Sequence, residues 1–217
     1  MVTQSCAQAH PAATSFVLTP DMHLPHRRSA HALVLALCFS AAACDRAKQA
    51  DTTDISGVMP PLFFSMVRAN DGVSANAALY RGKVTLLYFG YTHCPDECPT
   101  TLANLAVALK NLGPDANDVR VLFVTVDPAR DSIPVLKKYV VAFAPQIDGL
   151  RGSSNAIAAL ARRYRVLYSV TPAEAGRTYD VTHSDALFMF DRSGRARLIT
   201  MSTKNTADVV AEIRSLF

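Results

Sequence analysis

The chain has 217 residues, a length that accommodates one domain of ordinary size plus extra segments at one end. Half of the residues are hydrophobic and 18% are charged, so the chain can bury a core and is not disordered as a whole. The net charge of +4 is small, and no cluster of Lys and Arg with interleaved aromatic residues occurs. These features argue against a nucleic-acid-binding function.

The N-terminal region has the layout of a bacterial secretory signal. A short basic region at 26–28 follows Met22 and precedes an apolar run from Ala32 to Ala43. The run is too short for a dependable transmembrane span, and it ends in small residues, as a signal-peptide cleavage site does. A signal that begins at Met22 implies that residues 1–21 come from an upstream choice of start codon.

The three alanines before Cys44 resemble the lipobox of bacterial lipoproteins, in which the Cys is lipidated and becomes the first residue of the mature protein. This resemblance makes Cys44 the expected lipid anchor and places the protein on the periplasmic side of the bacterial inner membrane. Ordinary cleavage nearby, or an uncleaved anchor, is the alternative. We therefore divide the chain into an upstream extension and signal peptide (1–43), the anchor Cys with a polar tether (44–61), and a folded domain (62–217).

Within 62–217 the hydrophobic pattern predicts alternating strands and helices. The predicted elements, in chain order, are an edge strand at 62–67 with a turn at 70–72, a buried strand at 84–90, a helix at 102–112, a buried strand at 119–126, a helix capped by Ser132, a helix at 154–165, an antiparallel hairpin at 186–201, and a last helix capped by Asn205. This order predicts an α/β fold, a central mixed sheet with helices on both faces. It is also the element order of the thioredoxin fold.

The segment with the most chemical information contains Cys94 and Cys98. It lies between the end of a predicted buried strand and the start of a helix, where open α/β sheets place their sites. The spacing brings both sulfurs to one side, and the helix N-terminus is expected to lower the cysteine pKa. Such a dithiol can exchange with disulfides or bind a soft metal. A structural disulfide is a third possibility, but it would close only a very short loop and add little stability.

A metal site needs a third ligand, and two histidines remain outside the predicted signal and upstream extension, His93 and His183. His93 adjoins Cys94 and should point away from it, because successive side chains in an extended segment face opposite sides. His183 opens the predicted late hairpin strand, beside the cysteine loop in a thioredoxin-like sheet. Two thiolates and an imidazole can hold Cu(I), and can tolerate Cu(II) with a further weak ligand, whereas structural zinc normally takes four ligands. On local sequence alone, such a His is more often a surface or core residue than a ligand.

Residues from about 62 to 217 resemble the Sco/SenC family of copper proteins. The matching segments are Gly82-Lys83, Phe89 to Asp96 with Cys98-Pro99, Val126-Asp127-Pro128 with Arg130-Asp131, and His183-Ser184. The resemblance implies that Cys94, Cys98 and His183 are copper ligands. It also implies delivery of copper to the dinuclear copper centre of a haem-copper oxidase, cytochrome c oxidase, or reduction of the cysteines of that centre.

Two acidic residues near the expected site could each act in more than one way. Glu97 lies between the cysteines, where the family usually has an apolar residue, and its carboxylate could raise the cysteine pKa or join the outer ligand shell. Asp127 follows a buried strand and could pair with Arg130, orient a ligand, or cap the turn before Pro128. The segment 168–179 is predicted to be a mobile polar loop that brings His183 onto copper.

The favoured interpretation is a metallochaperone without substrate turnover. The second is a thiol-disulfide oxidoreductase that uses Cys94 and Cys98 on partner cysteines, and the third is a peroxidase-like enzyme or redox sensor. Thioredoxin-type oxidoreductases place a cis-Pro before the late strand, where this chain has Thr182-His183. The expected partners are the copper-accepting oxidase subunit, another copper chaperone or a thioredoxin-like reductant, and the membrane through the lipid anchor. We expect a monomer and no nucleic-acid partner.

Overall fold

The computed structural model describes residues 51–171 and 179–217. The predicted signal peptide, Cys44 and the first part of the tether lie outside this range, as does 172–178 in the predicted mobile loop. None of the helices in the described part of the chain combines the length and the apolar character that a membrane span requires.

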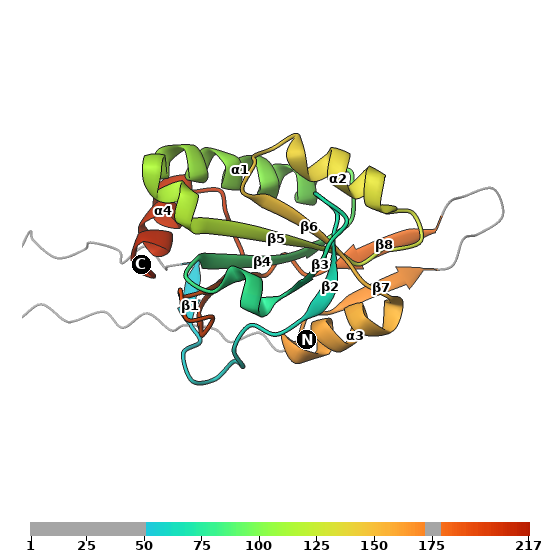
Figure 1. The fold of residues 1–217 in the computed structure, drawn as a ribbon, viewed down its shortest axis with the longest axis horizontal. Coiled ribbons are helices and arrows are strands. Elements are labelled where there is room, and N and C mark those ends of the chain that lie inside the picture. Colours follow the sequence, from blue (N-terminus) through green and yellow to red (C-terminus); the bar gives the residue numbers. More distant parts are fainter. Residues whose placement is uncertain (1–50, 172–178) are drawn as a thin grey trace, which may run out of the picture. The chain divides into compact units, whose positions relative to one another are not determined.

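The centre of the fold is an eight-stranded mixed sheet in the order β1-β10-β9-β4-β5-β6-β2-β3 (Figure 1). Its strands are β1 Thr52–Asp54, β2 Ser65–Arg68, β3 Ser74–Asn76, β4 Val84–Gly90, β5 Val119–Thr125, β6 Ile147–Arg151, β9 Leu187–Phe190 and β10 Ala196–Thr200. The central strands β4, β5 and β6 are parallel, and the remaining pairs are antiparallel. A separate two-stranded sheet joins β7 (Tyr168–Thr171) to β8 (Asp180–His183).

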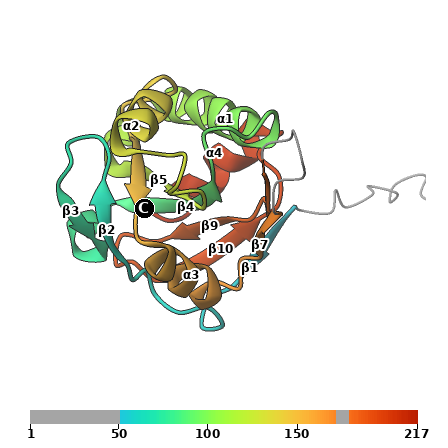
Figure 2. The same ribbon diagram turned by 90° about the vertical axis from the view of Figure 1, so that its right-hand side faces the viewer.

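Helices cover both faces of the sheet. Figures 1 and 2 show α1 and α2 over one face, with α4 beside α1, and α3 over the other. The helices are α1 Glu97–Leu112, α2 Ile133–Val141, α3 Ser154–Arg163 and α4 Thr206–Arg214, with short 3-10 helices at Ala77–Tyr80 and Gly113–Asp118. This arrangement confirms the predicted fold class.

The burial of β4 and of one face of α1 explains why these two elements were recognisable from the sequence. All seven residues of β4 are buried, because helices exclude water from both of its faces. On α1 the buried leucines recur at intervals of three and four, and Gly113 ends the helix with a φ of 62°, a conformation that suits glycine. The junction between β4 and α1 is therefore firmly anchored on both sides.

The prediction of an edge strand at 62–67 was wrong in its place in the sheet. β2 lies between β3 and β6, and β3 forms the edge. The neighbour β6 was missed because its residues include Asp148 and Gly149 and so form no continuous apolar run. The Asp148 carboxylate is nonetheless buried and accepts a 2.9 Å hydrogen bond from the Tyr80 hydroxyl. The predicted turn after β2 is present and joins it to β3.

The expected tether at 44–61 is partly folded. Residues 52–54 form β1, which pairs with β10, and the side chain of Ile55 is buried. The Ile55 N–H donates to the Arg197 carbonyl at 2.9 Å, and the Leu62 N–H donates to the Gly194 carbonyl at 2.8 Å. Because these contacts fix the segment to the sheet, the folded part begins before residue 62.

The region that precedes the late hairpin also differs from the prediction. Tyr168–Thr171 is a strand, β7, and pairs with β8 in a register that places Tyr168 opposite His183. His183 ends β8 and does not open the hairpin strand, since β9 begins at Leu187. The hairpin of β9 and β10 itself is confirmed. Short polar strands such as β7 and β8 bury too little apolar surface to show a clear period-2 pattern.

Candidate metal centre

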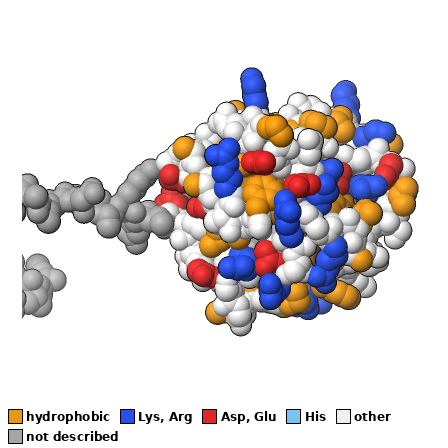
Figure 3. Space-filling model, turned by 60° about the vertical axis from the view of Figure 1, so that its left-hand side comes forward, with side chains coloured by type: hydrophobic (Ala, Val, Ile, Leu, Met, Phe, Trp, Pro, Cys, Tyr) orange, Lys and Arg blue, Asp and Glu red, His pale blue; other side chains and the backbone are white. Residues whose placement is uncertain are grey.

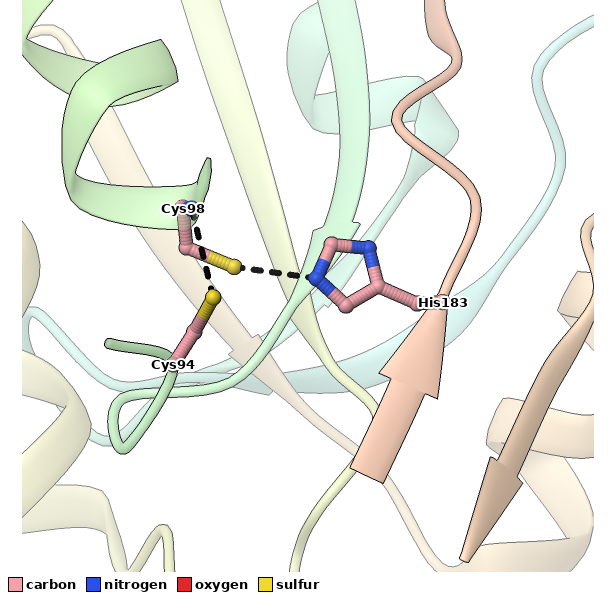
Figure 4. A group of neighbouring side chains, drawn as sticks. All are labelled: Cys94, Cys98 and His183. Carbon is pink, nitrogen blue, oxygen red and sulfur yellow. Dashed lines mark hydrogen bonds between the residues drawn. The ribbon is translucent and has the colours of Figure 1, made fainter. Parts of the chain in front are cut away.

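Three side chains from distant parts of the sequence meet at the end of the central sheet (Figure 4). Cys94 lies in the loop between β4 and α1, Cys98 in the first turn of α1, and His183 at the end of β8. The two Sγ atoms and one imidazole nitrogen lie within 4.8 Å of one another. The Sγ of Cys98 and the Nε2 of His183 are 3.1 Å apart. Among the described residues, this is the one group of three His, Cys, Asp or Glu side chains brought so close together.

Backbone contacts set the position of the two sulfurs. The Cys94 N–H donates to the Tyr91 carbonyl at 3.3 Å, which turns the loop back after β4. The Cys98 N–H then points at the Cys94 Sγ at 3.4 Å. The first N–H groups of a helix have no partner within the helix, so α1 offers this one to the sulfur. The two cysteines are not joined by a disulfide.

His183 is held so that one nitrogen faces the cysteines. Its Nδ1 lies 3.1 Å from the Ser184 carbonyl oxygen, a contact that favours the tautomer with its hydrogen on Nδ1 and leaves the Nε2 lone pair for a metal. The rings of Tyr88 and Tyr91 each meet the imidazole edge-on at 5.9 Å. Only 4% of the His183 side chain is exposed. The imidazole is thus oriented before any metal binds.

The expectation of lowered cysteine pKa values is wrong for Cys98. This thiol is fully buried, and burial raises its pKa well above the ordinary value. A hydrogen bond with the Tyr91 backbone lowers the pKa by a smaller amount. Desolvation is the largest contribution to this shift of the Cys98 pKa. A buried sulfur of this kind becomes a thiolate most readily when a metal cation supplies the compensating charge.

Asp131 fixes the start of the cysteine loop, a role that the sequence analysis did not assign. Its carboxylate is fully buried and accepts hydrogen bonds from the Thr92 N–H at 3.0 Å, the Thr92 hydroxyl at 2.6 Å and the Thr125 hydroxyl at 2.6 Å. The His93 side chain is half exposed, with its Nδ1 directed at Thr92 and Asp131. It does not belong to the cluster, which agrees with the expectation that it points away.

Asp127 and Glu97, the two acidic residues expected near the metal ligands, differ in burial. Asp127 is buried, bonds to the Arg130 guanidinium and accepts a 2.6 Å hydrogen bond from the Tyr179 hydroxyl. Burial alone would raise its pKa, but these hydrogen bonds outweigh burial and lower it. Arg130 in turn stacks over Tyr179 at 4.0 Å and over Tyr91 at 5.7 Å, so Asp127 reaches His183 only through other side chains. Glu97 begins α1 and is exposed.

Gly90, the last residue of β4, leaves the space that Cys98 occupies. A Cβ atom at this position would lie 2.7 Å from the Cys98 Sγ and 2.6 Å from the Phe123 ring. Real Cβ atoms do not approach other atoms so closely, and a close-packed interior gives little room for relief. The absence of a side chain at position 90 is therefore a requirement of the site. A glycine at the end of a buried strand is the signal in the sequence that could have predicted this close approach.

The donor set fits a soft metal. Two sulfurs and one imidazole nitrogen are the ligands that Cu(I) prefers, and no carboxylate that would favour a hard cation belongs to the cluster of described residues. The fold and the site together define a thioredoxin-like α/β protein with a dithiol–imidazole centre. Residues 62–217 match the model of the SCO1/SenC family, and the chain belongs to that family.

Curated relatives agree with this assignment. Over 146 residues, 63% of this chain and 55% of the relative, the chain is 39% identical to the mitochondrial protein SCO2 homolog of Bos taurus. It is also 39% identical to the mitochondrial protein SCO1 homolog 1 of Arabidopsis thaliana over 158 residues, 70% of this chain and 46% of the relative. The chain thus spans about half the length of these relatives.

Solved structures show the same fold. The copper-bound ScoI of Bradyrhizobium japonicum superposes with a TM-score of 0.65 at 32% identity, covering 72% of this chain and 99% of that structure. The apo Sco1 of Thermus thermophilus gives a TM-score of 0.67 at 33% identity, covering 76% of this chain and 96% of that structure. A copper-bound and a metal-free relative therefore share this architecture.

Proposed function

We propose that the protein is a copper metallochaperone that holds one copper ion through the Sγ atoms of Cys94 and Cys98 and the Nε2 of His183. The observation that carries the proposal is the convergence of these three atoms within 4.8 Å. A copper-bound structure of a similar protein supports copper as the cargo. The soft donor set supports Cu(I) as the principal state, with Cu(II) accepted when a further weak ligand is available.

The unequal exposure of the two cysteines suits transfer to a partner. Cys98 is fully buried, whereas Cys94 is partly exposed. An incoming thiolate or imidazole can therefore reach the metal on the Cys94 side and replace the protein ligands one after another. We propose the copper-accepting subunit of a haem-copper oxidase as the recipient, and another copper chaperone as the donor. The reaction takes place on the periplasmic face of the inner membrane, where lipid on Cys44 holds the chain.

Copper titration of the reduced full chain tests the ligand set. We expect one Cu(I) per chain in competition with a chromophoric chelator. Cys94→Ser and Cys98→Ser should abolish this binding, and His183→Ala should weaken it by more than about 100-fold, because loss of a direct ligand exceeds the effect of an outer contact. His93→Ala is the matched control and should leave the affinity unchanged. Equal affinity of the His183→Ala variant and the wild type would remove His183 from the site.

Dedicated thiol-disulfide exchange is the second candidate function. Cys94 and Cys98 are unpaired and lie in one short loop, with the Cys98 N–H directed at the Cys94 sulfur. In this reaction the two thiols give two electrons and two protons to a partner disulfide, which opens to two thiols while Cys94 and Cys98 become a disulfide. His183→Ala separates the two functions, because it removes a copper ligand and leaves both thiols. Full copper maturation of an oxidase by that variant would favour thiol exchange.

The proposed lipid anchor at Cys44 can be tested on the mature protein. We expect the mature chain to start at a lipid-modified Cys44, and Cys44→Ser to release the protein from the membrane. Intact mass measurement of the membrane-bound form checks both the modification and the N-terminus. Peptides from residues 1–21 in the mature or precursor protein would contradict the upstream start codon.

A further inference from the structure

The connection between β1 and β2 presents apolar side chains to solvent. Residues 55–67 include no charged side chain. Ile55 and Leu62 are buried and hold the connection to the core, whereas Val58 is 67% exposed and Phe63 is 66% exposed. Single exposed apolar residues are ordinary, but two large ones on one uncharged connection form the kind of surface that marks an interaction site.

Arginines from two other elements border this connection. Arg163 of α3 stacks over the Phe63 ring, with its guanidinium carbon 5.4 Å from the ring centroid, and donates to the Pro61 carbonyl at 3.2 Å. Arg197 of β10 donates to the Ser56 hydroxyl at 3.0 Å. The contacts place positive charge directly beside the exposed apolar side chains.

A third arginine lines a hollow in the same surface. Arg195, in the turn before β10, and Ala196 face residues 57–61 across a hollow of about 590 Å³. Arg195 and Arg197 share the Asp191 carboxylate, but the arginine side chains are 74% and 42% exposed and that of Asp191 is 10% exposed. The cations therefore lie outermost and the anion beneath them. We call this the basal surface, made of Val58, Phe63, Arg163, Arg195 and Arg197.

The proposed lipid anchor is tied closely to this side of the domain. Asp51 follows Cys44 by seven residues, and an extended chain spans at most about 3.6 Å per residue, so the two lie within about 25 Å of each other. A domain the size of residues 51–217 is about 40 Å across. Because the reach of the chain is shorter than the domain, the side that carries β1 stays near the bilayer.

The metal centre lies toward the opposite end of the sheet. Thr85, near the start of β4, pairs with Phe190 at the end of β9, next to the turn that carries Arg195, whereas Cys94 follows the end of β4. The seven residues of β4 span about 20 Å. Figure 1 shows β1 at the end of the sheet away from β7 and β8.

We propose that the basal surface docks on the bilayer that carries the lipid anchor. The apolar side chains enter the headgroup region, and the guanidinium groups meet anionic phospholipid headgroups, as in other interfacial segments that combine apolar and basic residues. The inference rests on the proposed anchor at Cys44. Docking in this way turns the metal centre away from the bilayer and toward its partners.

Single-Trp variants test this inference, because the chain contains no Trp. The mature, lipidated Val58→Trp protein is reconstituted into vesicles of phosphatidylethanolamine and phosphatidylglycerol. We expect its emission to shift to shorter wavelength, and phospholipid brominated near the top of the acyl chains to quench it at least about twofold, because interfacial side chains reach the boundary between headgroups and acyl chains.

Val141→Trp is the matched control, because Val141 is also exposed but lies on α2, which covers the other face of the sheet from α3 (Figures 1 and 2). This reporter should emit as a Trp in water and stay unquenched. Adding Arg195→Glu to Val58→Trp should weaken the quenching, whereas adding Arg214→Glu, at an exposed position of α4, should not.

The lipid on Cys44, checked by intact mass, separates the two ways in which the test can fail. With the lipid present, an unquenched reporter at position 58, or equal quenching at 58 and 141, would overturn the docking and leave the anchor and the copper site untouched. A basal surface that serves a protein partner would give the unquenched result. A mature protein without lipid on Cys44 would contradict the anchor and this inference with it.

Discussion

At the scale of single residues, the metal centre depends on groups that are buried before the metal arrives. Cys98 and the His183 side chain are almost fully shielded, and Tyr88 and Tyr91 hold the imidazole from two sides. Such pre-orientation reduces the loss of side-chain conformational entropy that accompanies metal binding. It also makes the site sensitive to any added volume.

Gly90→Ala tests this sensitivity. The added Cβ would collide with the Cys98 Sγ and the Phe123 ring, so we expect a loss of about 1–3 kcal/mol in the free energy of unfolding and at least a 10-fold loss of Cu(I) affinity. Gly149→Ala is the matched control, because its Cβ would come within 2.7 Å of the Leu136 side chain, which is not part of the metal centre. That control should lose stability in chemical denaturation while its copper affinity is retained. A Gly90→Ala variant with native copper affinity would contradict this account of the packing.

At the scale of elements, the junctions between strands and helices position the ligands. The loop after β4 carries Cys94, α1 carries Cys98, and β8 brings His183 to them from a separate small sheet. Figure 1 shows β7 and β8 beyond the end of the central strands, which is where α/β sheets commonly place their sites. The turn after β5 contributes the Asp131 carboxylate that ties this edge together.

Asp131→Asn should loosen the cysteine loop. An amide presents an N–H pair where the carboxylate accepted from Thr92 and Thr125, so at least one buried donor loses its partner. We expect a decrease of about 1–3 kcal/mol in the free energy of unfolding, measured by denaturant titration, and a weaker copper affinity. Asp118→Asn, which breaks only exposed ion pairs with Lys83 and Arg192, should cost less than about 1 kcal/mol. Equal losses in the two variants would contradict the special role of Asp131.

The elements also explain what the sequence could and could not predict. The strands β4 and β5 are long enough to show a continuous apolar run, and the helix α1 is long enough to show its periodicity; together they fix the fold and the place of the two cysteines. β6 was missed because a buried Asp and a Gly interrupt it, and β7 because its exposed residues show no apolar period. The approach of His183 to the cysteines is a long-range contact, so only the thioredoxin-like order of the elements and the family resemblance pointed to it. Gly90 and Asp131 act through packing and buried hydrogen bonds that no short motif encodes.

At the scale of the whole molecule, charge is distributed in local pairs. Figure 3 shows Lys and Arg side chains interspersed with Asp and Glu over the face in view. Asp191 is one centre of such pairing, since it accepts hydrogen bonds from the Ser193 N–H and hydroxyl and lies within reach of Arg195 and Arg197. Burial alone would raise its pKa, but these hydrogen bonds outweigh burial and lower the pKa to about 2.

The Asp191 pKa predicts a dependence of stability on pH. Its value in the unfolded chain is about 3.9, so the folded state favours the ionised form. The stabilisation is present in full above about pH 5 and is lost as the pH falls toward 2, with a total of about 2 kcal/mol. Asp191→Asn should remove this part of the pH dependence, which unfolding titrations between pH 5 and pH 2 would measure. Asp115→Asn, at an exposed position, should preserve this pH dependence of stability. An Asp191→Asn variant with the wild-type dependence would refute its attribution to Asp191.

The central claim is that Cys94, Cys98 and His183 together hold one copper ion, and X-ray absorption spectroscopy of the Cu(I)-loaded protein tests it most directly. We expect two sulfurs and one nitrogen bound to each copper, with the nitrogen lost in His183→Ala. A shell of sulfur alone, or a nitrogen that persists in His183→Ala, would contradict the account, because the imidazole of His183 would then not be the third ligand.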